Sequence, residues 1–142
     1  MKIRTIAVLC LMTAALAALP SSLHAQDDAA VKDLQKQMKG VGQAMKGLKQ
    51  KVDAKDSDKV AEVGDKLAEL FAKTAPYWES KKVEDATKWT KEAVQSAKEF
   101  SAAAKAGEWD KAKTANGAMG KSCKSCHEAH REKLDDGSYR IK

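Results

Sequence analysis

The sequence contains few of the residues that usually fill a protein core. Aromatic residues make up 5% of its 142 residues, and there are only two prolines. Large aliphatic residues are also sparse, and glycines interrupt the first apolar stripe at positions 40, 42 and 47. Each such glycine costs up to ~1 kcal/mol relative to alanine within a helix. We therefore expect that something other than side chains fills part of the interior.

Long blocks of like charge are absent as well. The chain has 26 Lys and Arg against 20 Asp and Glu, and the two signs alternate, as in "KKVEDATKWTKE". Lys2 and Arg4 precede residue 26, so the segment from 26 to 142 has a net charge of 24 − 20, or +4. This mild excess is typical of solvated helix faces and argues against nucleic acid as a partner.

The N-terminal segment predicts export. Lys2 and Arg4 precede an apolar run from about Ile6 to Leu19, which small and polar residues follow up to Ala25. The run is shorter than the ~20 residues that span a bilayer, so we predict a secretory signal peptide at residues 1–25 and no stable membrane insertion. Cys10 would leave with this signal. Residues 26–142 would form one domain in the periplasm.

Four stretches have apolar residues at alternating spacings of three and four, which predicts amphipathic helices. Their expected ranges are about 28–52, 57–74, 83–106 and 108–134. Pro76 is expected to end the second helix, and Gly107 to cap the third. The third has an alanine-rich face that allows close approach of a neighbour. The last eight residues, "DDGSYRIK", are expected to fray.

No alternation with a period of two, no Asn-Gly hairpin signal and no βαβ pattern competes with the helices. The predicted fold class is therefore all-α, an antiparallel up-down-up-down four-helix bundle. A three-helix bundle with a long arm is the alternative.

The segment "GKSCKSCHEAHREK" carries most of the functional information. Cys123, Cys126, His127 and His130 would all lie on one helix, spread over about two turns, so they cannot converge on a single zinc ion. A thiol-disulfide site is a stronger alternative, but reactive CxxC pairs lie at helix N-termini, and this pair lies late in its helix. The third interpretation is that Cys-x-x-Cys-His is a site of covalent haem attachment.

Haem attachment accounts for the spacing of the two cysteines and the histidine and for the shortage of core-filling side chains. In this interpretation, Cys123 and Cys126 bond to the two haem vinyl groups as thioethers, and His127 is then placed to ligate the iron. A bulky haem would fill the space that the side chains leave. We therefore predict one covalent haem c per chain.

An exported four-helix chain with "CKSCHEAHR" near its C-terminus resembles class II c-type cytochromes, the cytochrome c prime family. The resemblance covers the whole segment 26–142 in helix number and motif placement. It implies that Cys123 and Cys126 carry the thioethers and that His127 is the proximal ligand. Arg131 matches a basic residue that the family commonly carries near the haem. His130 departs from the family pattern, and we interpret it as a packing or surface histidine.

The residue opposite His127 distinguishes the branches of that family. The resemblance places the distal face on the first helix, which contains Met38 and Met45. Met38 is the predicted sixth ligand, as in the low-spin branch, whereas an open position would give a high-spin protein that binds nitric oxide or carbon monoxide. We expect Val41, Trp89, Phe100 and Met119 to form walls of the haem pocket.

The function that follows is electron transfer between periplasmic redox proteins, not enzymatic catalysis. Gas binding by a five-coordinate haem is the alternative, and a CxxC thiol-disulfide protein is a distant one. The resemblance also allows a homodimer in which two bundles pair through their first two helices.

Overall fold

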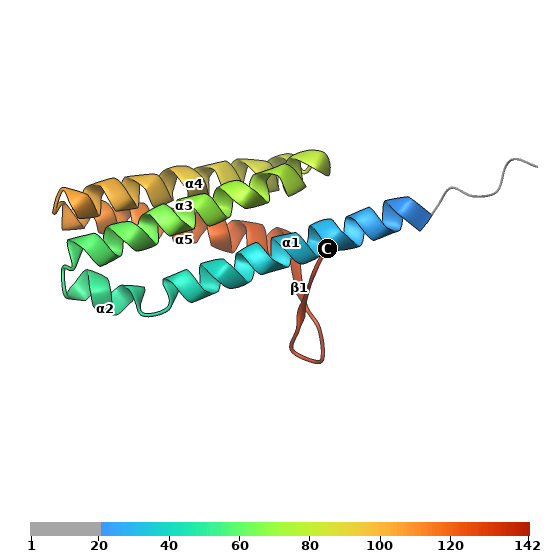
Figure 1. Ribbon diagram of the computed structural model, residues 1–142, viewed down its shortest axis with the longest axis horizontal. Coiled ribbons are helices and arrows are strands. Elements are labelled where there is room, and N and C mark those ends of the chain that lie inside the picture. Colours follow the sequence, from blue (N-terminus) through green and yellow to red (C-terminus); the bar gives the residue numbers. More distant parts are fainter. Residues whose placement is uncertain (1–20) are drawn as a thin grey trace, which may run out of the picture.

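Four long helices, each roughly 22 to 25 residues long, make up most of the protein (Figure 1). The computed structural model describes the backbone of residues 21–142 and the side chains of residues 28–142. The long helices are α1 (Ser21–Met45), α3 (Ser57–Ser80), α4 (Glu84–Lys105) and α5 (Trp109–His130). A short helix, α2 (Leu48–Asp53), links α1 to α3, and the strands β1 (Arg131–Lys133) and β2 (Tyr139–Ile141) follow α5. The all-α four-helix bundle is confirmed. Residues 1–20 of the predicted signal lie outside the described residues, so the signal peptide stays a prediction.

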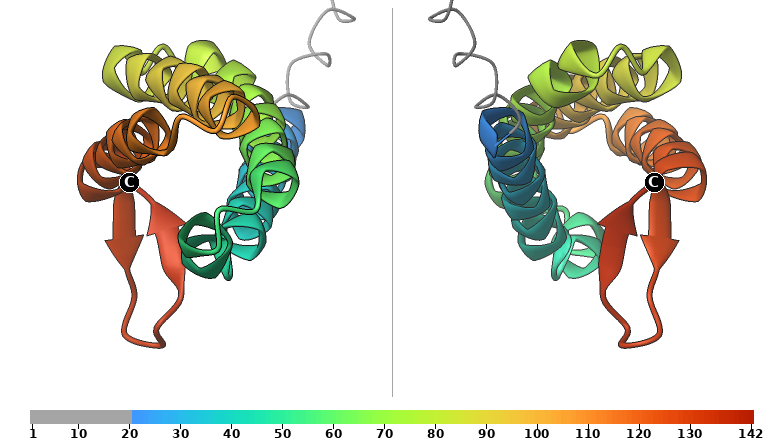
Figure 2. Two further views of the ribbon diagram at one scale, coloured as in Figure 1. Left: turned by 90° about the vertical axis from the view of Figure 1, so that its left-hand side faces the viewer. Right: turned by 90° about the vertical axis from the view of Figure 1, so that its right-hand side faces the viewer.

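The long helices pack in chain order. Helix α3 packs against α1 and α4, and α4 packs against α5, whereas α1 and α5 approach each other little within the described residues. The end-on views in Figure 2 show the hairpin leaving α5 on the side where α1 lies. One seam of the bundle is therefore not closed by direct helix packing.

The first helix is shorter at its C-terminal end than predicted. We expected one helix over residues 28–52, but the chain turns at Lys46 and Gly47, and Gly47 has φ +72. This left-handed conformation suits glycine, which has no Cβ to clash. Leu48 is buried beyond the turn and starts α2. Tertiary packing therefore divides one apolar stripe into two helices.

The second predicted helix continues past Pro76, where we expected it to end, and α3 stops only at Ser80. Pro76 lies on the exposed face, so the Ala72 carbonyl that loses its helical donor can bind water. One turn further on, Trp78 is buried at 7% exposure. The packing of this large side chain in the core favours the extra turn.

The third helix and its cap agree with the prediction. Gly107 has φ +70, and its N–H donates to the Ala104 carbonyl at 3.0 Å. The N–H of Glu108 donates to the Ala103 carbonyl at 2.9 Å, which completes a Schellman-type cap.

The C-terminal tail does not fray but forms a hairpin. Helix α5 ends at His130 rather than near Leu134, and Arg131 pairs with Ile141 in the antiparallel β1–β2 ladder. In the loop, Gly137 has φ +82, and the Ser138 N–H donates to the Asp136 carboxylate at 2.8 Å. The "DDGS" sequence is therefore a turn signal that the prediction overlooked.

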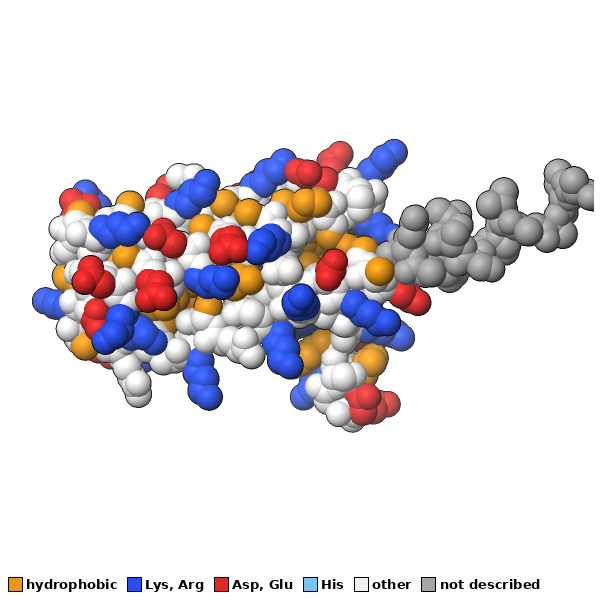
Figure 3. All heavy atoms as spheres, in the orientation of Figure 1, with side chains coloured by type: hydrophobic (Ala, Val, Ile, Leu, Met, Phe, Trp, Pro, Cys, Tyr) orange, Lys and Arg blue, Asp and Glu red, His pale blue; other side chains and the backbone are white. Residues whose placement is uncertain are grey.

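The surface carries both charge signs. Figure 3 shows Lys and Arg side chains interspersed with Asp and Glu over the face it presents. Many of them form ion pairs within one helix, such as Lys73–Glu69, and others link helices, such as Lys105–Asp65 at 2.9 Å. Among the described residues, no helix combines the length and the apolar character that crossing a membrane would require.

The alanine-rich face of α4 lets α3 approach closely, as predicted. A Cβ built on Gly64 of α3 would lie 2.8 Å from Ser101 Cβ and 2.9 Å from its backbone nitrogen. The Gly64→Ala variant should therefore lose about 1–3 kcal/mol of unfolding free energy, measured by urea denaturation, because the two backbones must move apart.

Gly117→Ala is the matched control, because nothing lies within 4 Å of a Cβ at this helical glycine. That variant should gain about 0.5–1 kcal/mol. A Gly64→Ala protein as stable as the Gly117→Ala protein would contradict the close helix contact.

Candidate functional site

A cavity of about 540 Å³ lies along the seam between α1 and α5. Its size is within the ~300–1,000 Å³ range of pockets that hold cofactors and drug-sized ligands. All four long helices and the hairpin contribute to its walls. The residues that bear on function are Leu34, Met38, Val41, Trp78, Trp89, Cys123, Cys126, His127, His130, Arg131, Tyr139, Arg140 and Ile141.

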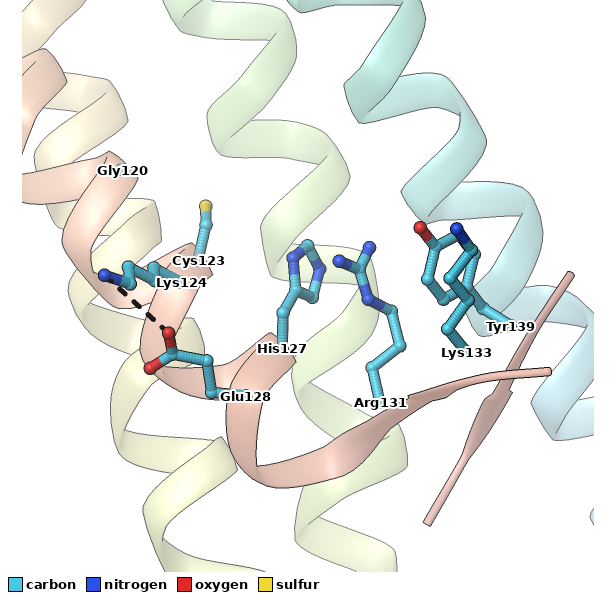
Figure 4. A pocket seen from close by; sticks show the side chains of 8 residues that line it. All are labelled: Gly120, Cys123, Lys124, His127, Glu128, Arg131, Lys133 and Tyr139. Atoms are coloured by element: carbon cyan, nitrogen blue, oxygen red, sulfur yellow. Dashed lines mark ion pairs between the residues drawn. The ribbon is translucent and has the colours of Figure 1, made fainter. Parts of the chain in front are cut away.

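The α5 wall carries the Cys-x-x-Cys-His motif. Cys123, Cys126 and His127 occupy positions i, i+3 and i+4 of the helix, so they share one face, and all three line the cavity. Each is partly buried. Figure 4 shows Cys123 and His127 projecting from the same side of α5. The motif therefore presents two thiols and one imidazole to a single space.

Both cysteines are free thiols, and their surroundings suppress ionisation. Burial raises the pKa of the Cys123 thiol. Burial, with smaller contributions from Cys123 and the Asp85 carboxylate, raises the pKa of Cys126 to about 11. Thiol-disulfide exchange proceeds through the thiolate, so catalytic CxxC pairs have lowered pKa values. The environment of this pair is opposite to what a thiol-disulfide protein needs.

The surroundings of His127 favour the neutral form of its imidazole. Burial, assisted by the positive charge of Arg131, lowers the pKa of His127. Metal ligation by histidine requires a neutral ring nitrogen. The surroundings of His127 therefore favour the protonation state that an iron ligand needs. Elsewhere in the described residues, as here, no three His, Cys, Asp or Glu side chains are grouped to hold a bare metal ion.

The facing wall comes from α1. Met38 is half-buried and packs against two core clusters, the Leu67–Phe71 cluster that Cys123 also contacts and the Leu34–Trp78 cluster that Cys126 also contacts. Met45 is 39% exposed and does not line the cavity. The structure thus brings Met38, but not Met45, to the same cavity as His127. Ligation itself stays a prediction.

Two of the four residues expected in the pocket walls are there. Val41 and Trp89 line the cavity, whereas Phe100 and Met119 do not. Phe100 belongs to a separate core cluster with Leu48 and Val60, away from the motif. Met119 is 1% exposed and packs beneath Cys123 in the bundle core. Phe100 and Met119 follow the same spacing of three and four along their helices as the residues that line the cavity. The two groups differ only in the rotation of the helices and in their position along the bundle.

His130 is a packing residue, as expected from the sequence. Its ring centroid lies 5.3 Å from that of Trp78 and 6.1 Å from that of Trp89. Its Nε2 lies 2.9 Å from the Asp85 carboxylate. The contacts fix His130 at the edge of the cavity, between α3, α4 and α5.

Arg131 lies beside the motif. It is exposed, and it lines both the main cavity and an adjoining groove of about 560 Å³ that Cys123, His127 and Tyr139 also line. The guanidinium carbon lies 4.3 Å from the centroid of the Tyr139 ring. Figure 4 shows Arg131 between His127 and Tyr139.

Several cavity residues were not foreseen. Leu34 precedes Met38 by one helical turn, so the spacing could have identified it. Trp78 falls between the predicted helices 57–74 and 83–106, in a stretch with no predicted helix. Tyr139 and Ile141 belong to the segment expected to fray, although the "DDGS" turn signal could have indicated their return to the helices.

The residues present fit a haem. Two thiols and an imidazole lie on one wall, a thioether sulfur is available from the opposite helix, and apolar side chains surround them. The fold and the site therefore define a four-helix protein with a c-type attachment motif on its last helix.

Comparison with known protein families matches residues 23–131 to the family described as Cytochrome C'. The match covers most of the chain, so the chain belongs to the cytochrome c' family. Members of this family bind covalently attached haem c. No curated protein and no solved structure gave a significant match.

Proposed function

We propose that the protein is an exported cytochrome that carries single electrons, and that His127 and Met38 would both ligate its haem iron. One observation carries the proposal: His127 and Met38 line the same cavity from helices on its two sides. Cys123 and Cys126 lie beside His127 on α5 and would form the thioethers. Together these residues would hold the haem along the α1–α5 seam.

The protein residues would have three tasks in this function: to position the cofactor, to ligate its iron and to exclude water. Cys123 and Cys126 would hold the haem in place. His127 would supply a nitrogen ligand and Met38 a thioether, and methionine ligation raises the reduction potential of haem iron. Trp78, Val41 and Leu34 would exclude water from the interior. When bound, the haem supplies the redox chemistry.

The family and the N-terminal sequence support a periplasmic location, because family members are usually periplasmic. The partners would then be periplasmic redox proteins, and no substrate needs to bind. A gas-binding role is the alternative, and it requires that Met38 leave the iron open.

The test uses protein produced with a haem-maturation system. The purified protein should be red, and its haem should stay with the polypeptide in acidified organic solvent. The reduced protein should show a low-spin spectrum that carbon monoxide leaves unchanged. Extractable haem would contradict the covalent attachment, and a high-spin spectrum that carbon monoxide alters would favour gas binding over electron transfer.

A further inference from the structure

The hairpin of residues 131–142 lies almost wholly beyond the family match, which ends at residue 131. Four of its residues, Arg131, Tyr139, Arg140 and Ile141, nonetheless line the main cavity, and the last three lie beyond the family match. This segment reaches the cavity from the C-terminal end of α5, beside the α1–α5 seam that direct helix packing leaves open (Figure 2).

Several contacts hold the hairpin against the bundle. Ile141 is half-buried and packs on the cluster of Leu34, Trp78 and Ala86, which joins α1, α3 and α4. The Lys142 N–H donates to the His130 carbonyl at 3.0 Å, and its ammonium donates to the Glu128 carbonyl at 3.1 Å. These bonds satisfy carbonyls in the last turn of α5, which would otherwise have no helical donor. The hairpin is therefore attached both to α5 and to the opposite helices.

The hairpin also contributes side chains to the surroundings of His127. The Tyr139 ring lies under the Arg131 guanidinium, and both side chains line the two spaces that His127 faces. A cross-strand pair, Arg140 with Glu132 at 2.7 Å, supports the ladder in which Tyr139 sits opposite Lys133. Stacking on an aromatic ring restricts where a guanidinium can lie. Tyr139 therefore holds Arg131 next to His127.

We propose that residues 131–142 form an additional wall of the haem cavity, which limits the access of water to its His127 side, with Ile141 as the anchor and Tyr139 as the positioning residue for Arg131. The inference rests on the proposed haem site. Its physical consequence is a change in redox behaviour, because burial of a haem and the exclusion of solvent tune its reduction potential. Water that enters next to the iron stabilises the more highly charged ferric state, so an opened wall lowers the potential.

The experiment compares full-length holoproteins. Ile141→Ser removes the apolar anchor, and Tyr139→Ala removes the ring beneath Arg131. Tyr139→Phe keeps that ring and is the conservative rescue, while Asp135→Ala alters an exposed residue at the hairpin tip and is the matched control. The measurements are the reduction potential and the hydrogen exchange of backbone amides in residues 127–142.

Ile141→Ser and Tyr139→Ala should shift the potential to lower values, and Ile141→Ser should also speed exchange of the Leu134 and Lys142 amides several-fold. Tyr139→Phe and Asp135→Ala should match the unaltered protein in both measurements. If Ile141→Ser does not fold, the difference in reduction potential between Tyr139→Ala and Tyr139→Phe tests the inference. Equal potentials in Tyr139→Ala, Tyr139→Phe and the unaltered protein would overturn the inference.

Failure of the proposed haem site gives a different result. In that case the unaltered protein has no covalent haem, or its spectrum does not depend on Met38. The other outcome is a haem protein whose spectrum depends on Met38 but whose reduction potential is the same in all hairpin variants. That result would refute the hairpin wall and leave the haem site intact.

Discussion

Met38→Ala should convert a low-spin haem protein into a high-spin one that binds carbon monoxide. Alanine has no sulfur to donate, and the apolar neighbours Leu34 and Val41 on the α1 wall of the cavity offer no ligand atom. Gln35 and Lys39 also line the cavity from α1, but both are exposed residues. The reduction potential should fall with the loss of the thioether. Optical spectra of the ferric and ferrous protein, with and without carbon monoxide, measure the change.

Met45→Ala is the matched control for this experiment. Met45 lies on the same helix, is 39% exposed and does not line the cavity. Its removal should leave the spectrum and the carbon monoxide response unchanged. If Met38→Ala gives the same spectrum as Met45→Ala, then Met38 is not an iron ligand and the electron-carrier proposal loses its main support.

The double variant Cys123→Ser with Cys126→Ser should yield a poorly folded apoprotein. The exchange of sulfur for oxygen changes side-chain volume little, so the main effect is the loss of the cofactor that fills the α1–α5 seam. The cavity of about 540 Å³ would then hold water against apolar walls that include Leu34, Trp78 and Val41. We expect the double variant to melt at least about 10 °C below the unaltered haem protein and with a broader transition, measured by circular dichroism.

Ser125→Ala provides the control, since Ser125 lies between the two cysteines and does not line the cavity. That protein should retain its haem and its cooperative transition. A double variant that melts as sharply and at the same temperature as the Ser125→Ala protein would show that the polypeptide closes its own core, contrary to the composition argument.

Local sequence patterns were sufficient for the helices and for the α5 wall of the site. The spacing of three and four in the sequence places Cys123, Cys126 and His127 on one helix face, because that geometry depends only on 3.6 residues per turn. The Gly107 cap is similarly local, since a left-handed residue after a helix is favourable for glycine wherever the helix packs.

Packing between distant segments overrode local signals in three places. Gly47 divides the first apolar stripe at a left-handed turn, and Leu48 is buried in the core beyond it. Helix α3 continues past Pro76, and Trp78 is buried in the added turn. Ile141 finds an apolar cluster built from three helices, so a polar tail becomes an ordered hairpin. Each cluster includes partners that are far apart in the sequence, such as Leu34 and Ile141 in the cluster of Trp78.

The walls of the cavity show the same division. Phe100 and Met119 have the same helical period as Val41 and Trp89, but they point into closed core rather than into the cavity. The spacing of apolar residues identifies which face of a helix points inward. Whether an inward residue reaches the cavity at the α1–α5 seam depends on how the other helices are arranged around it.

By itself, the sequence determined the all-α class, the helix that carries the attachment motif and the shortage of core-filling side chains, because these depend on composition and on spacing within single helices. Only the tertiary structure decided that Met38, and not Met45, shares a cavity with His127, and that the C-terminal hairpin lines it. Those outcomes depend on helix rotation and on contacts between residues far apart in the chain, which no local spacing encodes.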